Sequence, residues 1–573
     1  MTQNKPSRNA EFAYIWDVAN QPDCSGGNQA MGAETMSPLK VLLLLGMGAL
    51  LSAAPALAED RVPQPAGTAG AAPAAALPKQ YPLAQSLSTA IAGLTPATAD
   101  PERKDQEALK AFYEARGYAA LWVTGGGVSA KAPSLLVAFK DADAYGLSPK
   151  DFLLPKDVSA AGTPDERAAA ELKFSLAALT YARFARGGRI ADPAALLTTQ
   201  LDRRPQWIEP KQVLEGLAAA PDAGAYLSGL NPKHAQFEKL RQLYIAERAK
   251  TDGPKLSTAA KHLRANMEMW RWMADDMGLK TGDASSGMYV LNNIPEFMQY
   301  VYKDGQIVRS ERIVAGKIDK QSSIFSRPLK FVVLRPMWTV PDSIKVNELW
   351  PSLRHGGGIM RKFGLEVQTK DGDKVNWHSI DWAKANILDY DVTQPPGPSS
   401  ALGHVKFSFP SQHTIYMHDT PDKWMFNSAQ RTLSHGCLRV RNPMALAEMI
   451  LKEDKGWDKD KIAELDRSGP LNNEVTIDKR IPIHLVYFTA WVDDAGKLKT
   501  YKDIYGHEKR VIQALDGQWD KIDKGRDHLA PIDVNARPDL VASDGTQRDT
   551  RRNGQKRAKL SGGLFGDLLD LGW

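Results

Sequence analysis

The sequence predicts a multidomain α+β protein in which a mainly helical N-terminal part precedes a β-rich domain. The chain has 573 residues, more than a single hydrophobic core normally holds. Apolar residues recur at helical spacing between about 101 and 265, and alternation typical of strands begins near Met288. Residues 347–400 interrupt that alternation, which predicts an insertion able to fold over a site as a lid.

The helical part is expected to be a scaffold domain spanning residues 101–285. It contains no cluster of catalytic side chains, and its aromatic residues are interpreted as core. Glycines at 117 and at 187–188 are expected to end two of its helices. The predicted helices cover residues 107–116, 133–144, 164–186 and 236–250.

The β-rich domain is expected to span residues 286–495. Asp304-Gly305 predicts a hairpin between strands 297–302 and 306–314, because this dipeptide favours a tight turn. An apolar run at 481–492 predicts a central strand, and further strands are expected at 330–334 and 405–409. Helices are expected at 444–452 and from Asp381-Trp382 onward.

The N-terminus resembles an export signal. The apolar run 41–52 precedes Ala56-Leu57-Ala58, a small-residue cleavage pattern. Residues 1–58 are therefore interpreted as a signal peptide region, with translation starting at Met31 or Met36 and the mature protein in the periplasm. An uncleaved inner-membrane anchor is the alternative. Residues 59–100 are rich in Ala, Pro and Gly, which predicts a flexible linker.

Residues 496–573 are expected to form a C-terminal extension, disordered from about 535. Between 548 and 559 it carries six basic residues and one acid. This pattern indicates a solvated tail or a contact with an anionic envelope surface. No basic stripe lies on a folded segment, which argues against a nucleic-acid partner.

Cysteine usage points to one residue. The chain has two cysteines, and Cys24 lies upstream of the expected cleavage site. Cys437 would then be the one thiol of the mature protein, in a compartment where paired cysteines normally form disulfides. Such a thiol is either buried and inert or reactive, and the histidine and glycine beside it favour a reactive nucleophile.

His418 is the predicted general base for Cys437, with a backbone carbonyl such as that of Asp419 fixing its tautomer. His435 is the alternative base, or else it shapes the pocket. The backbone N–H groups of Gly436 and Cys437 are candidates for an oxyanion hole. Either Arg439 or Arg441 could bind a substrate carboxylate, the alternative for both being a salt bridge.

No metal or cofactor is predicted. If residues 413–418 are extended, Thr414, Tyr416 and His418 share one face and His413 lies on the other, which argues against a site using both histidines. A zinc site built from His413, His418, His435 and Cys437 remains the alternative because these are zinc-ligand types.

His418, Ser434-His435-Gly436-Cys437, Arg439 and Asn442 together resemble the signature of the YkuD-type L,D-transpeptidases. Further segments resemble the large YcbB-like branch of that family, at residues 293–295, 315–317, 338–344, 396–397, 401–403 and 418–421. The resemblance covers about 286–495 and implies that Cys437 is the nucleophile, His418 the base and 347–400 a capping subdomain. Substrate-binding positions would be Tyr416, Ser434, Arg439 and Asn442.

The resemblance implies a periplasmic enzyme of peptidoglycan biosynthesis, with roles in cell-wall organisation and cell shape. Cys437 would attack a donor tetrapeptide stem and pass the acyl group to an acceptor amine, giving a 3→3 cross-link, and carbapenems would acylate it. An L,D-carboxypeptidase or a lipoprotein-attaching enzyme would use the same nucleophile. A non-catalytic cell-wall scaffold is the alternative from another class. Residues 230–280 are short for the peptidoglycan-binding module that the branch often carries.

Overall fold

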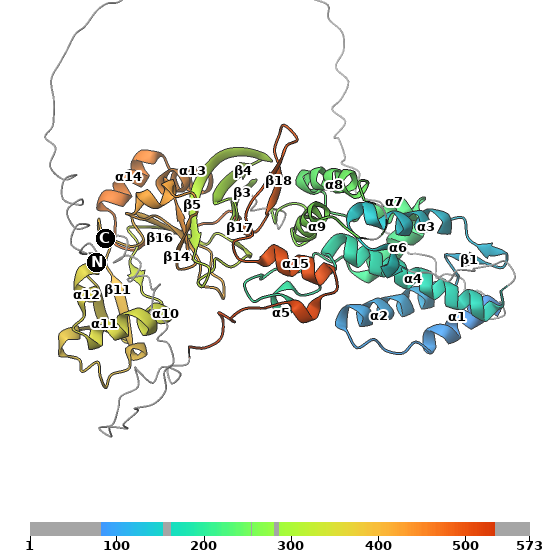
Figure 1. Ribbon diagram of the computed structural model, residues 1–573, viewed down its shortest axis with the longest axis horizontal. Helices are drawn as coiled ribbons and strands as arrows, with labels where there is room; N and C mark the ends of the chain where they lie inside the picture. Colours follow the sequence, from blue (N-terminus) through green and yellow to red (C-terminus); the bar gives the residue numbers. More distant parts are fainter. Residues whose placement is uncertain (1–81, 153–161, 252, 254, 280–285, 533–573) are drawn as a thin grey trace, which may run out of the picture. The chain divides into compact units, whose positions relative to one another are not determined.

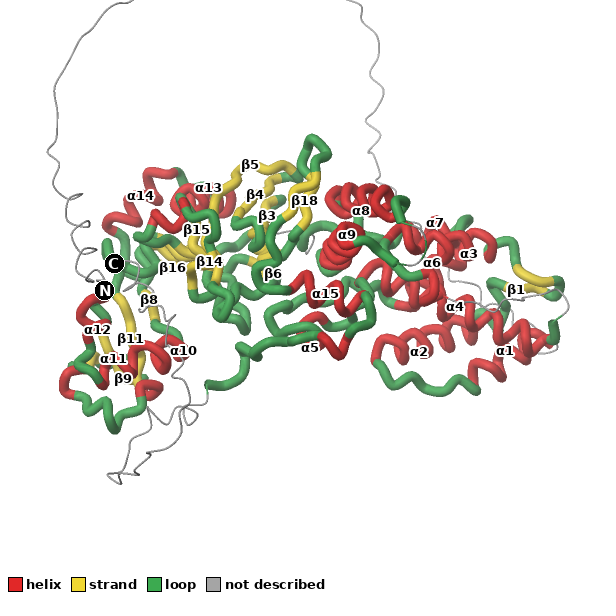
Figure 2. Tube along the Cα trace, in the orientation of Figure 1, coloured by secondary structure: helices red, strands yellow, loops and turns green. Residues whose placement is uncertain are grey.

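The computed structural model describes residues 82–152, 162–251, 253, 255–279 and 286–532 (Figures 1 and 2). It confirms the predicted fold class, a helical N-terminal scaffold followed by a β-rich domain with an inserted cap. Among these described residues, no helix is both long and apolar enough to cross a membrane. The predicted signal peptide region and the basic stretch at 548–559 lie outside the described residues.

Helix α4 (Pro164–Gly187) is central to the scaffold. Thr163 and Glu166 form a reciprocal capping box at its start, with Pro164 in the first turn. Its buried Glu171 accepts hydrogen bonds from the amides of residues 121–123 and from the Tyr113 hydroxyl. The other scaffold helices are α2 (Asp100–Ala115), α3 (Ala132–Lys140), α5 (Pro193–Leu196), α6 (Pro210–Ala219), α7 (Ala223–Ser228), α8 (Ala235–Arg248) and α9 (Thr258–Trp270). A short hairpin joins β1 (Val123–Thr124) to β2 (Gly127–Val128).

Part of the predicted linker is a helix, which corrects the sequence expectation. Helix α1 (Pro82–Ala92) lies within residues 59–100 and contacts α4. Leu83, Leu87 and Ile91 follow each other at four-residue spacing, and Leu87 and Ile91 are buried in the scaffold core. This short apolar stripe was not recognised in the sequence because the surrounding residues are mostly Ala, Pro and Gly.

The β-rich domain is built on one large, mainly antiparallel sheet with the order β16-β7-β12-β13-β15-β5-β4-β3-β17-β6, and β14 pairs with β5. The predicted hairpin is confirmed as β4 and β5, turning at Asp304-Gly305. Strands β13 and β15 are parallel neighbours near the middle. The strands are β3 (Met288–Asn293), β4 (Met298–Lys303), β5 (Gln306–Gly316), β6 (Ser326–Pro328), β7 (Phe331–Leu334), β12 (Val405–Ser408), β13 (Met417–His418), β14 (Thr432–Ser434), β15 (Leu438–Val440), β16 (Asn473–Thr476) and β17 (Pro482–Val486).

Two features near the end of this domain differ from the prediction. The apolar run 481–492 is two strands, β17 and β18 (Ala490–Val492), because the buried Asn266 side chain accepts the amides of Thr489 and Ala490 between them. Strand β18 pairs with β19 (Leu498–Thr500) instead of joining the large sheet. Helices α13 (Pro443–Lys455), which contains the predicted 444–452, and α14 (Lys459–Ser468) lie between β15 and β16.

The cap is a compact unit with its own apolar core, seen in Figure 1 as the group around α10–α12 and β11. It begins at Trp338, earlier than the predicted residue 347, because β8 (Trp338–Thr339) pairs with β11 (Tyr390–Gln394). No helix starts at Asp381-Trp382, where instead a turn is held by the Trp382 indole donating to the Trp377 carbonyl. The remaining elements are α10 (Asp342–Ile344), α11 (Trp350–Arg354), α12 (Gly358–Phe363), β9 (Glu366–Thr369) and β10 (Lys374–Val375).

The beginning of the predicted C-terminal extension is part of the core. Helix α15 (His507–Leu515) contacts α9, and the buried Tyr505, Val511 and Leu515 join the core that α8 and α9 share with the sheet. Asp516 pairs with Lys261 and Arg264 of α9. Residues 517–532 follow as a mainly irregular segment, and the stretch predicted to be disordered lies outside the described residues.

Candidate active site

The nucleophile candidate sits in a tight turn between β14 and β15. Gly436 has φ +113°, a conformation that other residues rarely adopt. The buried Ser434 hydroxyl donates to the Cys437 carbonyl at 2.6 Å and accepts the Gly436 amide at 3.3 Å. Ser322 braces the turn from outside, donating to the Gly436 carbonyl at 2.6 Å while accepting the Gly316 amide at 2.9 Å. The turn therefore has a fixed shape before any substrate binds.

The parallel pairing of β13 with β15 brings His418 and Cys437 to adjacent strands. Met417 is in register with Leu438, and the Leu438 amide donates to the Tyr416 carbonyl at 3.0 Å. The His418 Nδ1–H donates to the Asp419 carbonyl at 2.5 Å, as the sequence predicted, which leaves Nε2 as the proton acceptor. Within the described residues no hydrogen bond joins His418 to Cys437, and the thiol contacts the Thr414 carbonyl at 3.9 Å. The base assignment therefore stays a prediction.

Both candidate catalytic groups rest in their neutral forms. Burial, with the nearby Arg439 and Lys406 cations, lowers the pKa of His418 to about 3, although the Asp419 and Ala401 carbonyls oppose this by favouring the imidazolium. Burial raises the pKa of the Cys437 thiol to about 11, against the opposing effects of Tyr416, Lys406 and Arg439. Cys437 as a whole residue is partly exposed.

Tyr416 connects the nucleophile to the cap. Its buried hydroxyl lies beside the Cys437 thiol and the Trp338 side chain, and burial, with the nearby Cys437, raises its pKa well above the ordinary value. The Lys406 ammonium lies over its ring, 4.9 Å from the centroid. The substrate-binding role predicted for Tyr416 remains a prediction, but the residue lies against the nucleophile.

His435 contacts the cap. Its Nε2 lies 2.5 Å from Lys320 Nζ and 3.3 Å from the Glu348 carboxylate, and Lys320 and Glu348 are 3.1 Å apart. Because the ammonium can only donate, Nε2 accepts and the ring proton sits on Nδ1. That Nδ1 is buried and has no hydrogen-bond partner among the described residues. These contacts favour a pocket role for His435 over that of base.

Three of the predicted substrate-binding residues make contacts within the chain, and their substrate-binding role stays a prediction. Arg439 is buried and pairs with Asp422 at 3.4 Å, and Arg441, the alternative carboxylate binder, pairs with Glu311 at 2.5 Å. Asn442 also donates to Glu311, at 3.0 Å, from the corner where α13 begins. Ser434 holds the turn, as described above. Local spacing could not reveal these partners because the carboxylates lie on other segments.

The oxyanion-hole prediction stays open. The Gly436 amide is directed at the Ser434 hydroxyl, although the 3.3 Å distance is long for a hydrogen bond. This leaves the amide of Cys437 as the stronger of the two predicted donors.

The zinc alternative does not agree with the geometry. Both ring nitrogens of His413 are occupied, by Asp202 at 3.1 Å and by His528 at 2.8 Å, so this residue does not join His418, His435 and Cys437. In the described part of the chain, no group of three or more His, Cys, Asp or Glu side chains is arranged to hold a metal. Thr414 has φ +52°, so residues 413–418 are not uniformly extended and the alternation argument does not apply there.

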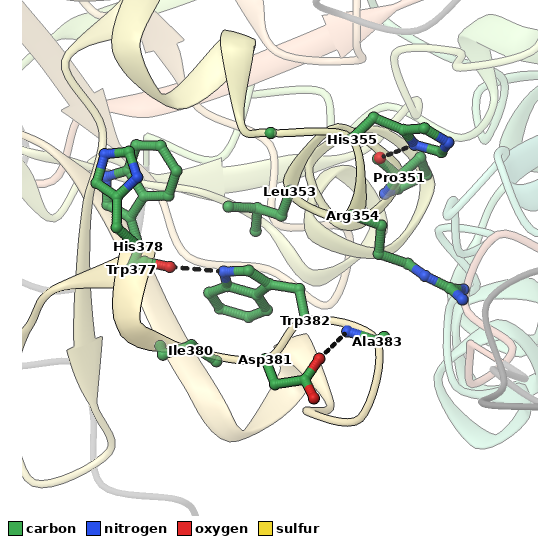
Figure 3. Close-up of a pocket in the computed structure, with 11 residues that line it drawn as sticks. Pro351, Leu353, Arg354, His355, Trp377, His378, Ile380, Asp381, Trp382 and Ala383 are labelled. Carbon is green, nitrogen blue, oxygen red and sulfur yellow. Dashed lines mark hydrogen bonds between the residues drawn. The ribbon is translucent and has the colours of Figure 1, made fainter. Parts of the chain in front are cut away.

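A cavity of about 610 Å³ lies in the cap, away from the predicted catalytic residues (Figure 3). Figure 3 shows the Trp382 indole between the stacked Trp377 and His378 on one side and Arg354 on the other. None of the candidate catalytic residues lines it.

Several residues of the site escaped the sequence analysis. The Thr414 carbonyl, Lys320 and Asp422 contact Cys437, His435 and Arg439, respectively. Trp338 was noted only within a motif, and Glu348 only within the insertion. Their roles depend on contacts between distant segments, for which no local spacing provides a signal.

The family models that match this chain agree with this architecture. Residues 287–458 match the L,D-transpeptidase catalytic domain (YkuD) family model, and residues 107–243 match a scaffold domain model. A Haemophilus influenzae protein named "Putative L,D-transpeptidase" is 32% identical over 247 residues, which cover 42% of this chain. The match spans about half, 48%, of that relative's own length. A solved L,D-transpeptidase from Mycobacterium smegmatis aligns with 35% of this chain and 58% of its own, at 13% identity and a TM-score of 0.16.

Proposed function

We propose that this protein forms 3→3 cross-links in peptidoglycan through a cysteinyl acyl-enzyme, because residues 287–458 match the family model of L,D-transpeptidase catalytic domains (YkuD). The observation that carries the proposal is the braced turn that presents Cys437 beside the strand holding His418. The partners would be a donor tetrapeptide stem and the side-chain amine of an acceptor stem. We place the reaction in the periplasm, on the strength of the export pattern in the sequence.

In the acylation step, Cys437 Sγ attacks the carbonyl carbon of the third stem residue. Its proton passes to His418 Nε2, and the Asp419 and Ala401 carbonyls stabilise the imidazolium that forms. The tetrahedral intermediate collapses with cleavage of the peptide bond to the terminal D-alanine. The imidazolium returns the proton to the leaving amine, which leaves a thioester on Cys437.

In the second step the acceptor amine attacks the thioester carbonyl. His418 takes a proton from the amine and returns it to the departing sulfur, so the thiol is regenerated and one new amide bond is formed. The Lys406 ammonium, which lies over the Tyr416 ring, and the Arg439 guanidinium are two cations near Cys437. Both favour the thiolate and the oxyanion that form during the reaction. Both cations are already in place in the resting protein.

The test is incubation of the purified protein with a disaccharide-tetrapeptide, with products read by mass. A cross-linked dimer that depends on Cys437 supports the proposal. Tripeptide alone would assign the chain as an L,D-carboxypeptidase, with water as acceptor, and would contradict cross-linking. Attachment of stems to a lipoprotein would appear only when that acceptor is added.

The Cys437→Ala variant is the control, and we expect it to fold but to form no dimer. Intact-mass analysis after exposure to a carbapenem is expected to show one adduct on the parent protein and none on this variant. An adduct that persists in Cys437→Ala would place the nucleophile elsewhere.

A further inference from the structure

The segment that follows α15 reaches the active site through one histidine. Residues 523–530 are exposed except for His528, which is half-buried. The His528 Nε2 lies 2.8 Å from His413 Nδ1, and the two rings stack with centroids 5.0 Å apart. The other ring nitrogen of His528 lies 3.1 Å from the Thr199 hydroxyl of the scaffold. The segment thus touches both the scaffold and the approach to the catalytic strand.

These contacts form a chain of hydrogen bonds with one consistent direction. Asp202 accepts at 3.1 Å, so the His413 proton lies on Nε2 and its Nδ1 is an acceptor. His528 must then donate from Nε2 to that acceptor, and its Nδ1 accepts from Thr199. The Ser323 hydroxyl, which donates to Gln200, is a second, longer acceptor for the same His528 proton at 3.3 Å. In this arrangement each ring nitrogen of both histidines has a hydrogen-bond partner.

His413, one member of this chain of hydrogen bonds, directly precedes Thr414, whose carbonyl lies beside the nucleophile. Thr414 follows His413 directly and has φ +52°, an unusual conformation for a β-branched residue. Such a conformation persists only where the surroundings impose it. The His413 side chain is fully buried and fixed at both ring nitrogens, and the Thr414 carbonyl lies 3.9 Å from Cys437 Sγ. The unusual backbone is therefore bounded by a locked histidine and by the nucleophile.

We propose that His528 is a positioning residue of the active site: through His413 it holds Thr414 in the conformation that places its carbonyl against Cys437 Sγ. The inference rests on the proposed function in that Cys437 is the nucleophile. His528 touches neither the sulfur nor the substrate and acts only through His413.

Charged groups lie on both sides of the histidine pair. Asp202 is paired with Arg327 at 3.2 Å and lies near Arg203, and the His413 contact and these cations hold its pKa below the ordinary value. On the side of His528, burial and His413 lower its pKa to about 4, with a smaller lowering by Arg526 and an opposing effect of Asp527. Because this pKa is depressed, His528 stays neutral until the pH falls towards that value. The hydrogen-bond chain is then lost at lower pH.

The test compares His528→Ala with Lys524→Ala in the full chain. Lys524 lies in the same segment and donates to the Ala195 carbonyl at 2.7 Å, but it does not contact His413 among the described residues. The first readout is the pH profile of Cys437 alkylation by iodoacetamide, followed on the peptide that contains Cys437. The second readout is the rate of dimer formation from the disaccharide-tetrapeptide.

We expect His528→Ala to move the alkylation midpoint to lower pH, because the carbonyl that disfavours the thiolate leaves the sulfur. The rate of dimer formation should fall about tenfold, since Cys437 Sγ is less well positioned to attack the substrate carbonyl. His528→Gln should restore part of both effects, because its amide can donate to His413 Nδ1. Lys524→Ala should leave both readouts unchanged.

An unshifted midpoint in folded His528→Ala would overturn the proposal, as would an equal shift in Lys524→Ala. If His528→Ala does not fold, Thr199→Val takes its place, because it removes only the hydroxyl that donates to His528 Nδ1. It should shift the midpoint in the same direction by less, and no shift would overturn the proposal. A shifted midpoint with no dimer even from the parent protein would contradict the proposed function and leave this inference standing.

Discussion

At the scale of single residues, the resting site holds a thiol and an imidazole, not an ion pair. The pKa of Cys437 is raised to about 11 and that of His418 is lowered to about 3, so neither group is charged at neutral pH. Proton transfer from sulfur to nitrogen must therefore occur as the substrate carbonyl is attacked. Such a thiol is protected from small electrophiles until a substrate binds.

This neutrality predicts the pH dependence of Cys437 alkylation. Because the thiolate is the reactive form, the iodoacetamide rate should rise about tenfold per pH unit from neutrality towards pH 11. The measurement is the second-order rate on the Cys437 peptide between pH 6 and 11. A plateau below pH 8 would mean that a thiolate–imidazolium pair already exists in the resting protein.

The proposed catalytic residues were visible in the sequence to different degrees. Cys437 was predicted to be the nucleophile from its own neighbours, since Ser434, His435 and Gly436 lie beside it. The assignment of the Asp419 carbonyl to His418 also depended on adjacent residues, and it is confirmed. The contact of Arg439 with Asp422 could not be predicted, because Asp422 lies on another segment that only the fold brings close.

At the scale of elements, the loop between β11 and β12 helps to orient the His418 ring. Gly403 has φ +56°, and a Cβ there would lie 2.4 Å from the Asp419 carboxylate. That carboxylate accepts the His404 amide at 3.1 Å, and the Asp419 and Ala401 carbonyls both act on His418. The glycine thus allows the loop and the strand end to approach each other closely.

Gly403→Ala is expected to damage both stability and catalysis. The left-handed conformation alone costs about 1–2 kcal/mol for an alanine, and displacement of Asp419 adds to this. The melting temperature should fall by several degrees, and dimer formation by about tenfold or more as His418 loses its orientation. Gly397→Ala is the matched control, because a Cβ there meets nothing within 4 Å. Equal behaviour of the two variants would disprove this role of Gly403.

Elements with a strong local sequence pattern were predicted well. Elements with a short pattern, or with bounds set by contacts to distant segments, were predicted poorly. The β4–β5 hairpin and α4 follow from Asp304-Gly305 and from a long apolar periodicity. The break between β17 and β18 could not be predicted, because Asn266, more than 200 residues away, takes up the amides there. Helix α1 was missed because its apolar stripe is only three residues long.

At the scale of the whole molecule, the cap and the catalytic turn are joined by a buried ionic contact. Glu348 of the cap meets both Lys320 and His435, and its side chain is 7% exposed. A buried pair of this kind contributes more to fixing a geometry than to stability. We infer that Glu348 sets the position of the cap over the nucleophile.

Glu348→Gln should therefore affect large substrates more than small reagents. Dimer formation should fall about tenfold because the cap loses its charged contact with the turn. Iodoacetamide alkylation of Cys437 should stay within about twofold, since the sulfur itself is not displaced. The matched control is Glu366→Gln, which removes a cap carboxylate whose one ion pair among the described residues is with the exposed Lys374, at 2.9 Å. Equal turnover by the two variants would refute a special role for Glu348.

The turn that holds Cys437 is supported by residues that are translated after it, and this has a consequence for protein synthesis. Tyr505 donates to the Gly316 carbonyl at the end of β5, and α15 completes the core beneath the sheet. A nascent chain therefore exposes Cys437 well before the residues that support its turn have left the ribosome. The thiol should acquire its native reactivity only after residue 505 and α15 have been translated, so chains truncated before residue 505 are expected to be inactive even though they contain His418 and Cys437.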